Sequence, residues 1–384
     1  MVIFLKGMLP TLDQFIDEMA SGIKEEHIII DIRNINELSK FETKINSSTI
    51  VITFNNVGLS IYADSSTTTY WEACNVTLFN VLVDHPYYYT KEIEKHSFDK
   101  LYYVCIDRNH VRFLRSIYPD RAANFLFLPH GGTNLCLLSP EKKDIEILYV
   151  GSCNSCINPK ELADDELTLY IFEFYEKYYK SKKAESFTST DSLLKASGLP
   201  QDKEMITSLE GIAITYEKYL TSVRRIGLIT ALASEGFTIT VYGSGIWDEL
   251  KQSGQYPTLD YRGHIAPEEC VRLIAKSKIL INDSPYFMQG AHERIFNGML
   301  NKTVIFTNES EYLQERFSDG KDILFWNGHN IDDAVSKIAE ALSDADYLNS
   351  IAESAFAKVT HDTWADRAMT LIDYANKNAT LMND

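Results

Sequence analysis

Short apolar runs alternate with longer amphipathic segments along the chain. In the first part the apolar runs are nearly continuous and rich in β-branched and aromatic residues, which is typical of strands in a sheet covered on both faces. We predict five strands there, at residues 27–32, 49–54, 77–84, 101–107 and 125–129. The segments 11–23 and 109–118 between them have helical spacing. The alternation predicts βα units around a parallel sheet.

A polar, turn-rich stretch near residues 137–145 precedes a second series of apolar runs. The strands predicted in this series are 145–151, 238–243, 259–263, 278–283, 302–308 and 322–326. Residues 157–222 interrupt the series with helical spacing, and they are rich in Glu, Lys and Tyr. We interpret them as a helical insertion whose charges form a solvated face. The prediction is an α/β chain with two doubly wound, Rossmann-like domains at 1–140 and 145–361.

Composition excludes several classes of protein. The 384 residues include 37 Lys and Arg against 54 Asp and Glu, a net charge of −17. The hydrophobic share of 45% is enough for a core, so a largely disordered chain is excluded. A surface of this charge repels phosphate backbones, so no nucleic-acid partner is expected. No apolar run approaches the roughly 20 residues of a membrane span, and we expect a cytoplasmic protein.

Cysteine spacing offers one motif, the pair Cys153 and Cys156 in GSCNSC. Such a pair is half of a zinc site or a redox pair when a second Cys/His pair or a thioredoxin-like context accompanies it. Neither is present in the sequence, so we predict no metal site. The remaining cysteines lie in apolar segments and are expected to be buried thiols.

Glycines and basic residues follow several strands of the second series, where helix N-termini present free N–H groups to anions. VYGSGIW (241–247) is a strand with a tight Gly-Ser-Gly turn, and YRGHI (261–265) ends a second strand. A helix expected to begin near Ala291 places His292 and Arg294 in its first turn. An arginine there is disfavoured by the helix dipole unless it has an anionic partner, so we predict a diphosphate site.

The order of these segments resembles the donor-binding half of GT-B glycosyltransferases, and most of all the spore-maturation-type branch of the family-1-like transferases. The residues that carry the resemblance are Gly151 and Ser152, Arg224 and Arg225, Tyr242 to Gly245, Gly263 to Ile265, and Arg294 to Asn297. The segment 360–375 is similar to the family's final helix. The resemblance covers residues 145–375 without the insertion. It implies that a helix over about 362–384 packs back on the N-terminal domain.

The resemblance also implies the ligands. The donor would be a nucleoside diphosphate sugar, with a UDP-sugar favoured, and neither a metal nor another cofactor would be needed. The residues expected to bind it are Gly151, Ser152, Arg224, Arg225, Tyr242, Gly243, Ser244, Gly245, Gly263, His264, Ile265, Ser284, Gln289, Gly290, His292, Arg294 and Asn297.

Two positions depart from the pattern of many retaining relatives, which carry two glutamates around the donor sugar and the ribose. The matching residues here are Gln289 and Asn297, and an amide cannot act as a charged acid or base. The departure favours an inverting mechanism, although Asn297 can still hydrogen-bond a ribose hydroxyl. Glu293 lies between the two positions and is a possible substitute.

An inverting transferase needs a base for the acceptor's proton. The ends of strands in the N-terminal half offer Asp84 and His85 in VDHPYYY, and His130 in LPHGG. We expect at least one of these three to be catalytic, with Asp84 and His85 first and His130 after them. The neighbouring tyrosines Tyr87 to Tyr89 could stack on a sugar ring.

The function predicted first is transfer of a sugar from the donor to a glycan or a protein acceptor. The alternatives left open are a nucleotide-sugar epimerase or phosphorylase on the same fold, and an inactive module that binds nucleotide sugars. The helical insertion also offers a surface for a possible homodimer.

Overall fold

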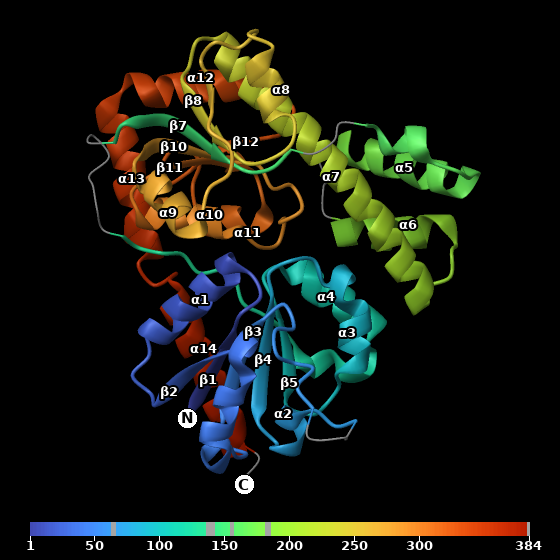
Figure 1. Ribbon diagram of the computed structural model, residues 1–384. Helices are drawn as coiled ribbons and strands as arrows, with labels where there is room; N and C mark the ends of the chain where they lie inside the picture. The colour runs from blue at the N-terminus through green and yellow to red at the C-terminus, as the bar shows by residue number, and fades with distance from the viewer. Residues whose placement is uncertain (63–66, 136–142, 154–156, 181–185, 382–384) are drawn as a thin grey trace. The chain divides into compact units, whose positions relative to one another are not determined.

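The computed structural model describes residues 1–62, 67–135, 143–153, 157–180 and 186–381. These residues form two compact units (Figure 1). Unit 1 comprises Met1–Gly131 and Asp362–Asp384, and unit 2 comprises Gly132–His361. Each unit is an α/β body with its own parallel sheet, so each is described separately.

The sheet of unit 1 has six parallel strands in the order β2-β1-β3-β4-β5-β6. They are β1 (Val2–Lys6), β2 (His27–Asp31), β3 (Ile50–Phe54), β4 (Thr77–Leu82), β5 (Leu101–Cys105) and β6 (Phe125–Phe127). The α-helices of the unit are α1 (Pro10–Ser21), α2 (Tyr70–Ala73), α3 (Thr90–Lys95), α4 (Arg108–Ile117) and α14 (Trp364–Leu381). Three 3₁₀ helices accompany them, η1 (Ile32–Lys44), η2 (Pro86–Tyr89) and η3 (Pro119–Asn124).

Strand β1 is missing from the sequence-based prediction, which assigned no element to the first residues. It pairs with β2 on one side and β3 on the other, so it lies inside the sheet. Val2, Ile3, Phe4 and Leu5 are at most 2% exposed, as expected for a strand covered on both faces. Its apolar run is as short and continuous as those of the predicted strands.

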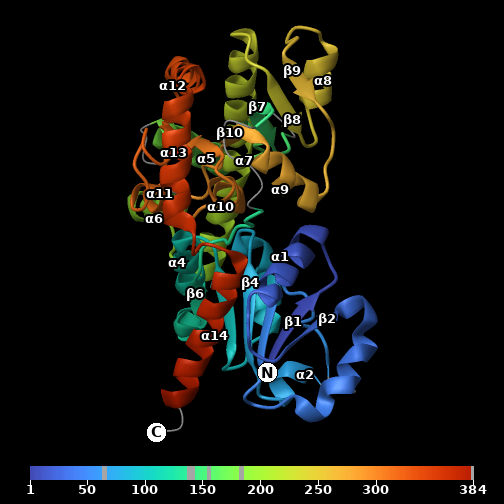
Figure 2. The ribbon, with the colours of Figure 1, turned by 90° about the vertical axis from the view of Figure 1, so that its left-hand side faces the viewer.

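Helix α14 lies beside α1 in unit 1 (Figures 1 and 2). The Trp364 ring stacks on Phe15 at a centroid distance of 4.3 Å and meets Phe54 edge-on at 5.4 Å. The Arg367 guanidinium donates to the His130 carbonyl at 3.0 and 3.1 Å and to the Asp362 carboxylate at 2.5 Å. These buried contacts fix the loop after β6 against the start of α14.

The sheet of unit 2 also has six parallel strands, in the order β12-β11-β10-β7-β8-β9. They are β7 (Ile145–Val150), β8 (Ile239–Tyr242), β9 (Leu259–Tyr261), β10 (Ser277–Asn282), β11 (Val304–Asn308) and β12 (Leu324–Trp326). The chain order reverses between β7 and β10, which are neighbours in the sheet. In open α/β sheets ligands bind outside the carboxyl ends of the strands at such a switch point.

The helices of unit 2 are η5 (Pro159–Leu162), α5 (Glu166–Lys180), α6 (Ser186–Ser197), α7 (Lys203–Ser234), α8 (Trp247–Gln252), α9 (Pro267–Ala275), α10 (Glu293–Leu300), α11 (Glu311–Gln314), α12 (Ile331–Ser343) and α13 (Ala345–Val359). Helices α5 and α6 pack along the first part of α7, away from the sheet (Figure 1). Helix α7 continues without a break past residue 222, near which the insertion was predicted to end, as far as Ser234. One helix therefore joins the insertion to the sheet.

Two charged side chains of the insertion are buried, contrary to the expectation of a solvated face. Glu210 and Glu217 on α7 are 0% and 2% exposed. Glu210 accepts a hydrogen bond of 2.9 Å from the Thr190 hydroxyl, which lies 2.7 Å from the Tyr175 hydroxyl. Helical spacing predicts which residues share one face of a helix. It cannot show that a neighbouring helix supplies hydroxyl groups as hydrogen-bond partners for a buried glutamate.

Several apolar side chains of the insertion are exposed. Ile157, Leu167, Leu169 and Tyr170 are between 39% and 57% exposed. A homodimer through this surface stays a prediction. None of the described helices combines the length and the apolar composition that crossing a bilayer requires.

Lys143 is a buried cation immediately before β7, with 4% of its surface exposed. Its Nζ donates to the Asn301 carbonyl at 2.8 Å and to the Thr303 hydroxyl at 2.5 Å, and burial lowers its pKa to about 7. The unfolded chain, in which the pKa is about 10.4, therefore binds the proton more strongly than the folded chain. Stability from this group rises as pH increases from about 7 to 10 and is lowest below that window.

We expect Lys143→Met to remove this dependence. The free energy of unfolding of the wild type minus that of Lys143→Met should increase between pH 7 and pH 10, measured by urea denaturation. Other groups that titrate in this range contribute equally to the free energy of unfolding of both proteins, so their contributions cancel in the difference. A constant difference across the window contradicts the assignment of a lowered pKa to Lys143.

Candidate functional site

The predicted donor residues after β7, β8 and β9 come together at one edge of the sheet of unit 2. The Gly151 N–H donates to the Tyr242 carbonyl at 2.8 Å, and the Gly243 N–H donates to the Gly263 carbonyl at 2.9 Å. The hydroxyls of Ser152 and Ser244 are 2.8 Å apart. Three loops that are distant in sequence therefore form one group at the carboxyl ends of their strands.

Glycine is needed where these loops approach one another. Gly243 has φ of 142°, and a Cβ on it would collide with the carbonyl of Gly151. A Cβ on Gly151 would lie 2.5 Å from the Tyr149 hydroxyl and 3.2 Å from Nη1 of Arg294. Any side chain at these positions would separate the loops or displace the arginine. Gly245 and Gly263 also have positive φ, of 98° and 81°.

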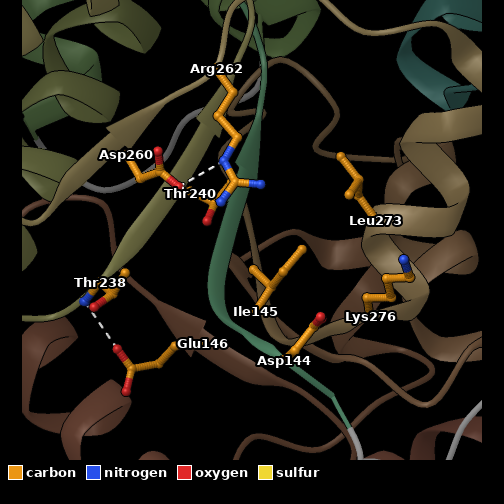
Figure 3. Close-up of a pocket in the computed structure, with 9 residues that line it drawn as sticks. All are labelled: Asp144, Ile145, Glu146, Thr238, Thr240, Asp260, Arg262, Leu273 and Lys276. Carbon is orange, nitrogen blue, oxygen red and sulfur yellow. Dashed lines mark hydrogen bonds and ion pairs between the residues drawn. The ribbon is translucent and has the colours of Figure 1, made fainter.

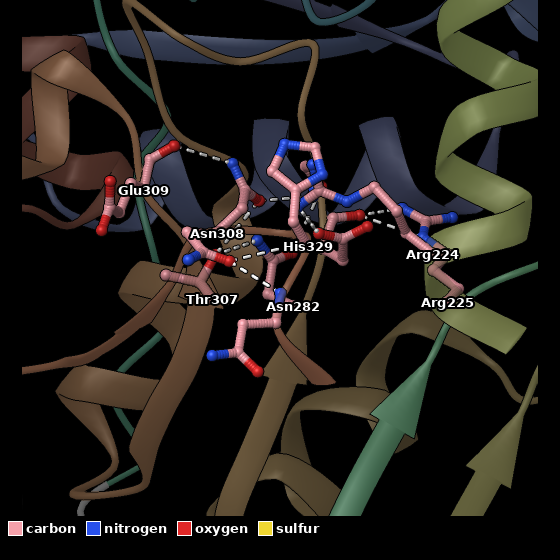
Figure 4. Close-up of polar contacts among 11 residues, drawn as sticks. Arg224, Arg225, Asn282, Thr307, Asn308, Glu309 and His329 are labelled. Carbon is pink, nitrogen blue, oxygen red and sulfur yellow. Dashed lines mark hydrogen bonds and ion pairs between the residues drawn. The ribbon is translucent and has the colours of Figure 1, made fainter. Parts of the chain in front are cut away.

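Arg225 connects the two strands at the switch point (Figure 4). It lies on α7 and is 8% exposed. Its Nε and Nη2 donate to the Asp283 carbonyl after β10 at 3.0 and 2.5 Å, and Nη1 donates to the Ser152 carbonyl after β7 at 3.2 Å. A guanidinium has five N–H donors, and Arg225 uses three of them on neutral carbonyls.

Arg294 reaches the same strand end from α10. Its Nη1 donates to the Val150 carbonyl at the end of β7, and Nε and Nη2 contact the His292 ring nitrogens at 3.2 and 2.9 Å. It is 8% exposed. Within the described part of the chain neither Arg294 nor Arg225 forms a salt bridge with a carboxylate. Two buried positive charges thus lie near the end of β7 without an anionic partner.

His292 differs from the prediction, because it is the N-cap of α10 and does not lie in the first turn. Its Nδ1 accepts from the Arg294 backbone N–H at 3.4 Å, and the ring contacts the Glu293 carboxylate. Burial lowers the pKa of His292, and the Arg294 charge lowers it further. The imidazole is therefore neutral near pH 7 and does not supply the cation expected beside Arg294.

Arg224 also differs from the prediction, because its charge is compensated within unit 2. It forms a salt bridge of 2.7 Å with Asp283, whose side chain is fully buried, and its guanidinium lies 5.0 Å from the centre of the Trp326 ring. Figure 4 shows it beside Arg225 at the ends of β10 and β11. Ser284, next to Asp283, is buried, and its N–H donates to Asn308 Oδ1 at 2.7 Å. Arg224 and Ser284 thus stabilise the structure of the site through their contacts with other residues of unit 2.

The two amides that replace the family's glutamates have partners in the protein. The Gln289 amide donates to the Glu311 carboxylate of α11. The Asn297 side-chain oxygen accepts the Thr133 N–H at 2.8 Å, and Asn301 donates to the Thr133 carbonyl at 2.7 Å. The Asn297 oxygen has a second lone pair and its NH₂ group is a donor, so the expected hydrogen bond to a ribose stays a prediction. Gly290 is buried beside Gln289.

His264 and Ile265 lie in the loop between β9 and α9, with His264 exposed and Ile265 half-buried. Cys153 is buried, and its thiol donates to the Ser222 carbonyl at 3.4 Å. Cys156, the other cysteine of the pair, lies outside the described residues.

Of the three base candidates in unit 1, only Asp84 is exposed. It follows β4, and its Oδ2 accepts hydrogen bonds of 2.9 Å from the Asn55 amide and the Tyr89 hydroxyl. Sequence reasoning missed Asn55, because nothing in the sequence relates residues 29 positions apart. It assigned Tyr89 to sugar stacking, whereas the hydroxyl binds Asp84.

His85 and His130 have structural surroundings. His85 is the N-cap of η2 and accepts the Tyr87 N–H at 3.2 Å, and its ring centre lies 4.3 Å from that of His110. His130 is 3% exposed and meets the Trp364 ring edge-on at 5.6 Å. These contacts give both imidazoles structural surroundings, and the expectation that at least one of Asp84, His85 and His130 is catalytic stays a prediction.

His110 is fully buried on α4, next to His85. Burial holds its pKa well below the usual value, and the charges of His85 and His130 add to this effect. The unfolded chain therefore takes up the proton first as pH falls below about 6.5. Stability from this group is present above that pH and is lost as pH falls toward the pKa of the folded state.

We expect the melting temperature of the wild type to fall more steeply between pH 7 and pH 5 than that of His110→Asn. The variant removes the buried titrating group and keeps a polar side chain. The measurement is differential scanning fluorimetry across this range. Parallel curves for the two proteins contradict the assignment.

A pocket of about 380 Å³ lies elsewhere in unit 2, at the amino ends of β7 and β8 (Figure 3). Its lining includes Glu146, Thr238 and Lys276, together with the pair Asp260 and Arg262, which are joined by a hydrogen bond of 2.7 Å. None of the predicted donor residues lines it. Acidic and basic groups mix in it, so it does not present one charge to a ligand.

Solved structures with a similar fold include glycosyltransferases. An alpha-glucosyltransferase in complex with UDP-glucose and DNA containing an abasic site has a TM-score of 0.56 at 10% identity, covering 98% of each chain. A glycosyltransferase from Rickettsia africae has a TM-score of 0.54 at 12% identity, covering 98% of this chain and 97% of the other. TarM has a TM-score of 0.48 at 10% identity over 88% of this chain, which spans 57% of the length of TarM.

A family model described as "Glycosyl transferase-like" matches residues 224–373. No curated protein matches the sequence. The GT-B fold expected from the sequence is confirmed by the two six-stranded sheets and the structural neighbours. The family match confirms the predicted enzyme class, a glycosyltransferase, for residues 224–373. The resemblance to the spore-maturation-type branch stays a prediction.

Proposed function

We propose that this protein transfers a sugar from a nucleoside diphosphate sugar to a glycan or protein acceptor, without a metal ion and with inversion at the sugar carbon. Unit 2 binds the donor diphosphate through Arg225, Arg294 and the loop at Gly151 and Ser152. Unit 1 supplies Asp84 as the base for the acceptor's proton.

The observation that carries this proposal is the pair of buried guanidinium groups at the switch point. Arg294 uses three donors on a carbonyl and an imidazole, and Arg225 uses three on carbonyls and also contacts the Tyr286 hydroxyl, so N–H donors remain on both guanidinium groups. Buried charges without a counterion are costly, and a bound anion removes that cost. The N-terminus of α10 adds its dipole. A diphosphate supplies the negative charge and the oxygen acceptors that this arrangement lacks.

UDP is the nucleotide we favour, because the alpha-glucosyltransferase with the similar fold was solved with UDP-glucose. That complex also contains DNA, but we do not propose DNA as the acceptor of this protein. A chain with a net charge of −17 repels a phosphate backbone. A glycan or a protein acceptor carries no such penalty. Arginine donors stabilise the leaving diphosphate, so the reaction should persist when EDTA is present.

The experiment is a thermal-shift screen with UDP, GDP and CMP, followed by assays of UDP release from UDP-glucose and UDP-N-acetylglucosamine. Ligands that bind only the folded state raise the melting temperature by mass action. We expect a shift with UDP and release of UDP from at least one donor. A shift without release supports the inactive binding module, and no shift with any nucleotide rejects the donor site.

A further inference from the structure

Asp84 is held by a network that leaves one of its oxygens open. Its Oδ2 accepts both the Asn55 amide and the Tyr89 hydroxyl, each at 2.9 Å. No described residue donates to Oδ1, and no described lysine, arginine or histidine forms an ion pair with Asp84. Two neutral donors fix the orientation of the carboxylate without neutralising its charge.

The backbone of Asn55 is itself fixed in an unusual conformation. Asn55 and Asn56 follow β3 with φ of 44° and 66°, the left-handed region that asparagine tolerates better than other non-glycine residues. The Asn56 N–H donates to Asn80 Oδ1 at 2.9 Å, and the Asn80 amide donates to Asn56 Oδ1 at 2.7 Å. Asn80 is fully buried in β4, so β4 holds the turn that follows β3.

A further contact orients the Asn55 side chain. Its Oδ1 accepts the Val83 N–H at 3.0 Å, which directs its NH₂ toward Asp84. Strained backbone conformations of this kind persist only where several surrounding contacts hold them, and they are concentrated at functional sites. The turn therefore presents one amide to one carboxylate.

Tyr89 reaches Asp84 through the 3₁₀ helix η2. His85 caps this helix through the Tyr87 N–H, and its ring packs against Phe113 at 5.3 Å and against His110. Burial raises the pKa of Tyr89, and the Asp84 carboxylate raises it further, so the hydroxyl stays a donor at working pH. The titratable groups on or next to η2 are His85, Tyr87, Tyr88 and Tyr89, and α4 carries His110.

We propose that Asn55 and Tyr89 are positioning residues, which hold the Asp84 carboxylate by Oδ2 and leave Oδ1 to take the acceptor's proton. This inference rests on the proposed function. In the step, the acceptor oxygen attacks the sugar carbon, the bond to the diphosphate breaks with its electron pair, and the acceptor's proton moves to Oδ1. A single defined oxygen facing the acceptor is what a base needs for a near-attack geometry.

Two measurements on the full chain test the inference. The first is the ¹³C chemical shift of the Asp84 carboxyl carbon at one fixed pH, assigned by difference with Asp84→Asn. Tyr89→Phe removes one of the two hydrogen bonds to Oδ2 and should move this resonance. Asn55→Asp keeps the acceptor for the Val83 N–H and tolerates the left-handed backbone, but it replaces the amide donor to Oδ2 by a carboxylate. It should move the resonance as well.

The second measurement is kcat for UDP release from UDP-glucose with water as acceptor, together with the dissociation constant of UDP. Both variants should lower kcat about 10- to 100-fold, because the carboxylate is no longer held in one orientation, while the dissociation constant of UDP stays unchanged. Tyr88→Phe is the matched control, because Tyr88 adjoins Tyr89 on η2 and does not donate to Asp84. It should leave both the resonance and kcat unchanged.

The outcomes distinguish a failure of the inference from a failure of the proposed function. An unchanged resonance in Tyr89→Phe and Asn55→Asp overturns the inference, whatever the activity. A shifted resonance with an unchanged kcat also overturns it, because the orientation of the carboxylate then does not matter for the reaction. A wild type that binds UDP but releases none from any donor overturns the proposed function, and with it the catalytic part of this role.

Discussion

Asp84→Asn is expected to lower kcat about 10²- to 10⁴-fold, the range that a positioned general base contributes. Asparagine keeps the size of the side chain and can still accept the hydrogen bonds of Asn55 and Tyr89. It cannot take a proton at the working pH. Because Asp84 lies in unit 1 and the donor residues lie in unit 2, the affinity for UDP should stay within about twofold of the wild type.

The assay is release of UDP from UDP-glucose, with UDP affinity measured by calorimetry on the same preparations. Asp120→Asn is a suitable control, since Asp120 is also an exposed aspartate of unit 1 and lies on η3. It should behave as the wild type. A kcat within threefold of the wild type for Asp84→Asn contradicts its role as the base.

Arg294→Met is expected to weaken UDP binding about 10- to 100-fold. A hydrogen bond from a charged donor contributes about 1.5–3 kcal/mol, which corresponds to that range. Methionine retains much of the volume beside Gly151 and removes only the donors and the charge. Arg225→Met should weaken binding as well, but it also removes the contacts to Ser152 and Asp283, so its melting temperature should fall.

Arg272→Met provides the control for charge alone. Arg272 lies on α9 of the same unit, is exposed, and pairs with Glu269 at 3.8 Å. Its replacement should leave UDP affinity unchanged. Equal losses in Arg272→Met and Arg294→Met would mean that the net charge of the unit, and not a built site, attracts the nucleotide.

Much of the fold could be predicted from the sequence, because buried parallel strands are short, nearly continuous apolar runs. Eleven of the described strands coincide with predicted ones, and β1 was missed at the start of the chain. The extent of α7 was also missed, since its apolar periodicity continues from the insertion into the body of unit 2. A pattern of hydrophobicity does not mark where one helix changes its packing partners.

The candidate site was predictable only in part. The glycines after β7, β8 and β9 and the arginines Arg225 and Arg294 are visible in sequence, because close approach and anion binding need these residue types. The partners of each side chain are not. Arg224 is neutralised by Asp283, and His292 caps a helix, although both belong to the same motif-bearing segments as the other candidates. Such pairings depend on the tertiary structure.

The measurement that tests the central claim most directly is a crystal structure with UDP. The account predicts the diphosphate at the carboxyl end of β7, with its oxygens within about 3 Å of guanidinium nitrogens of Arg225 or Arg294 and near the N–H groups of the Gly151–Ser152 loop. Density for UDP in the pocket of Thr238 and Arg262, or no density at concentrations that saturate the protein in solution, would contradict it.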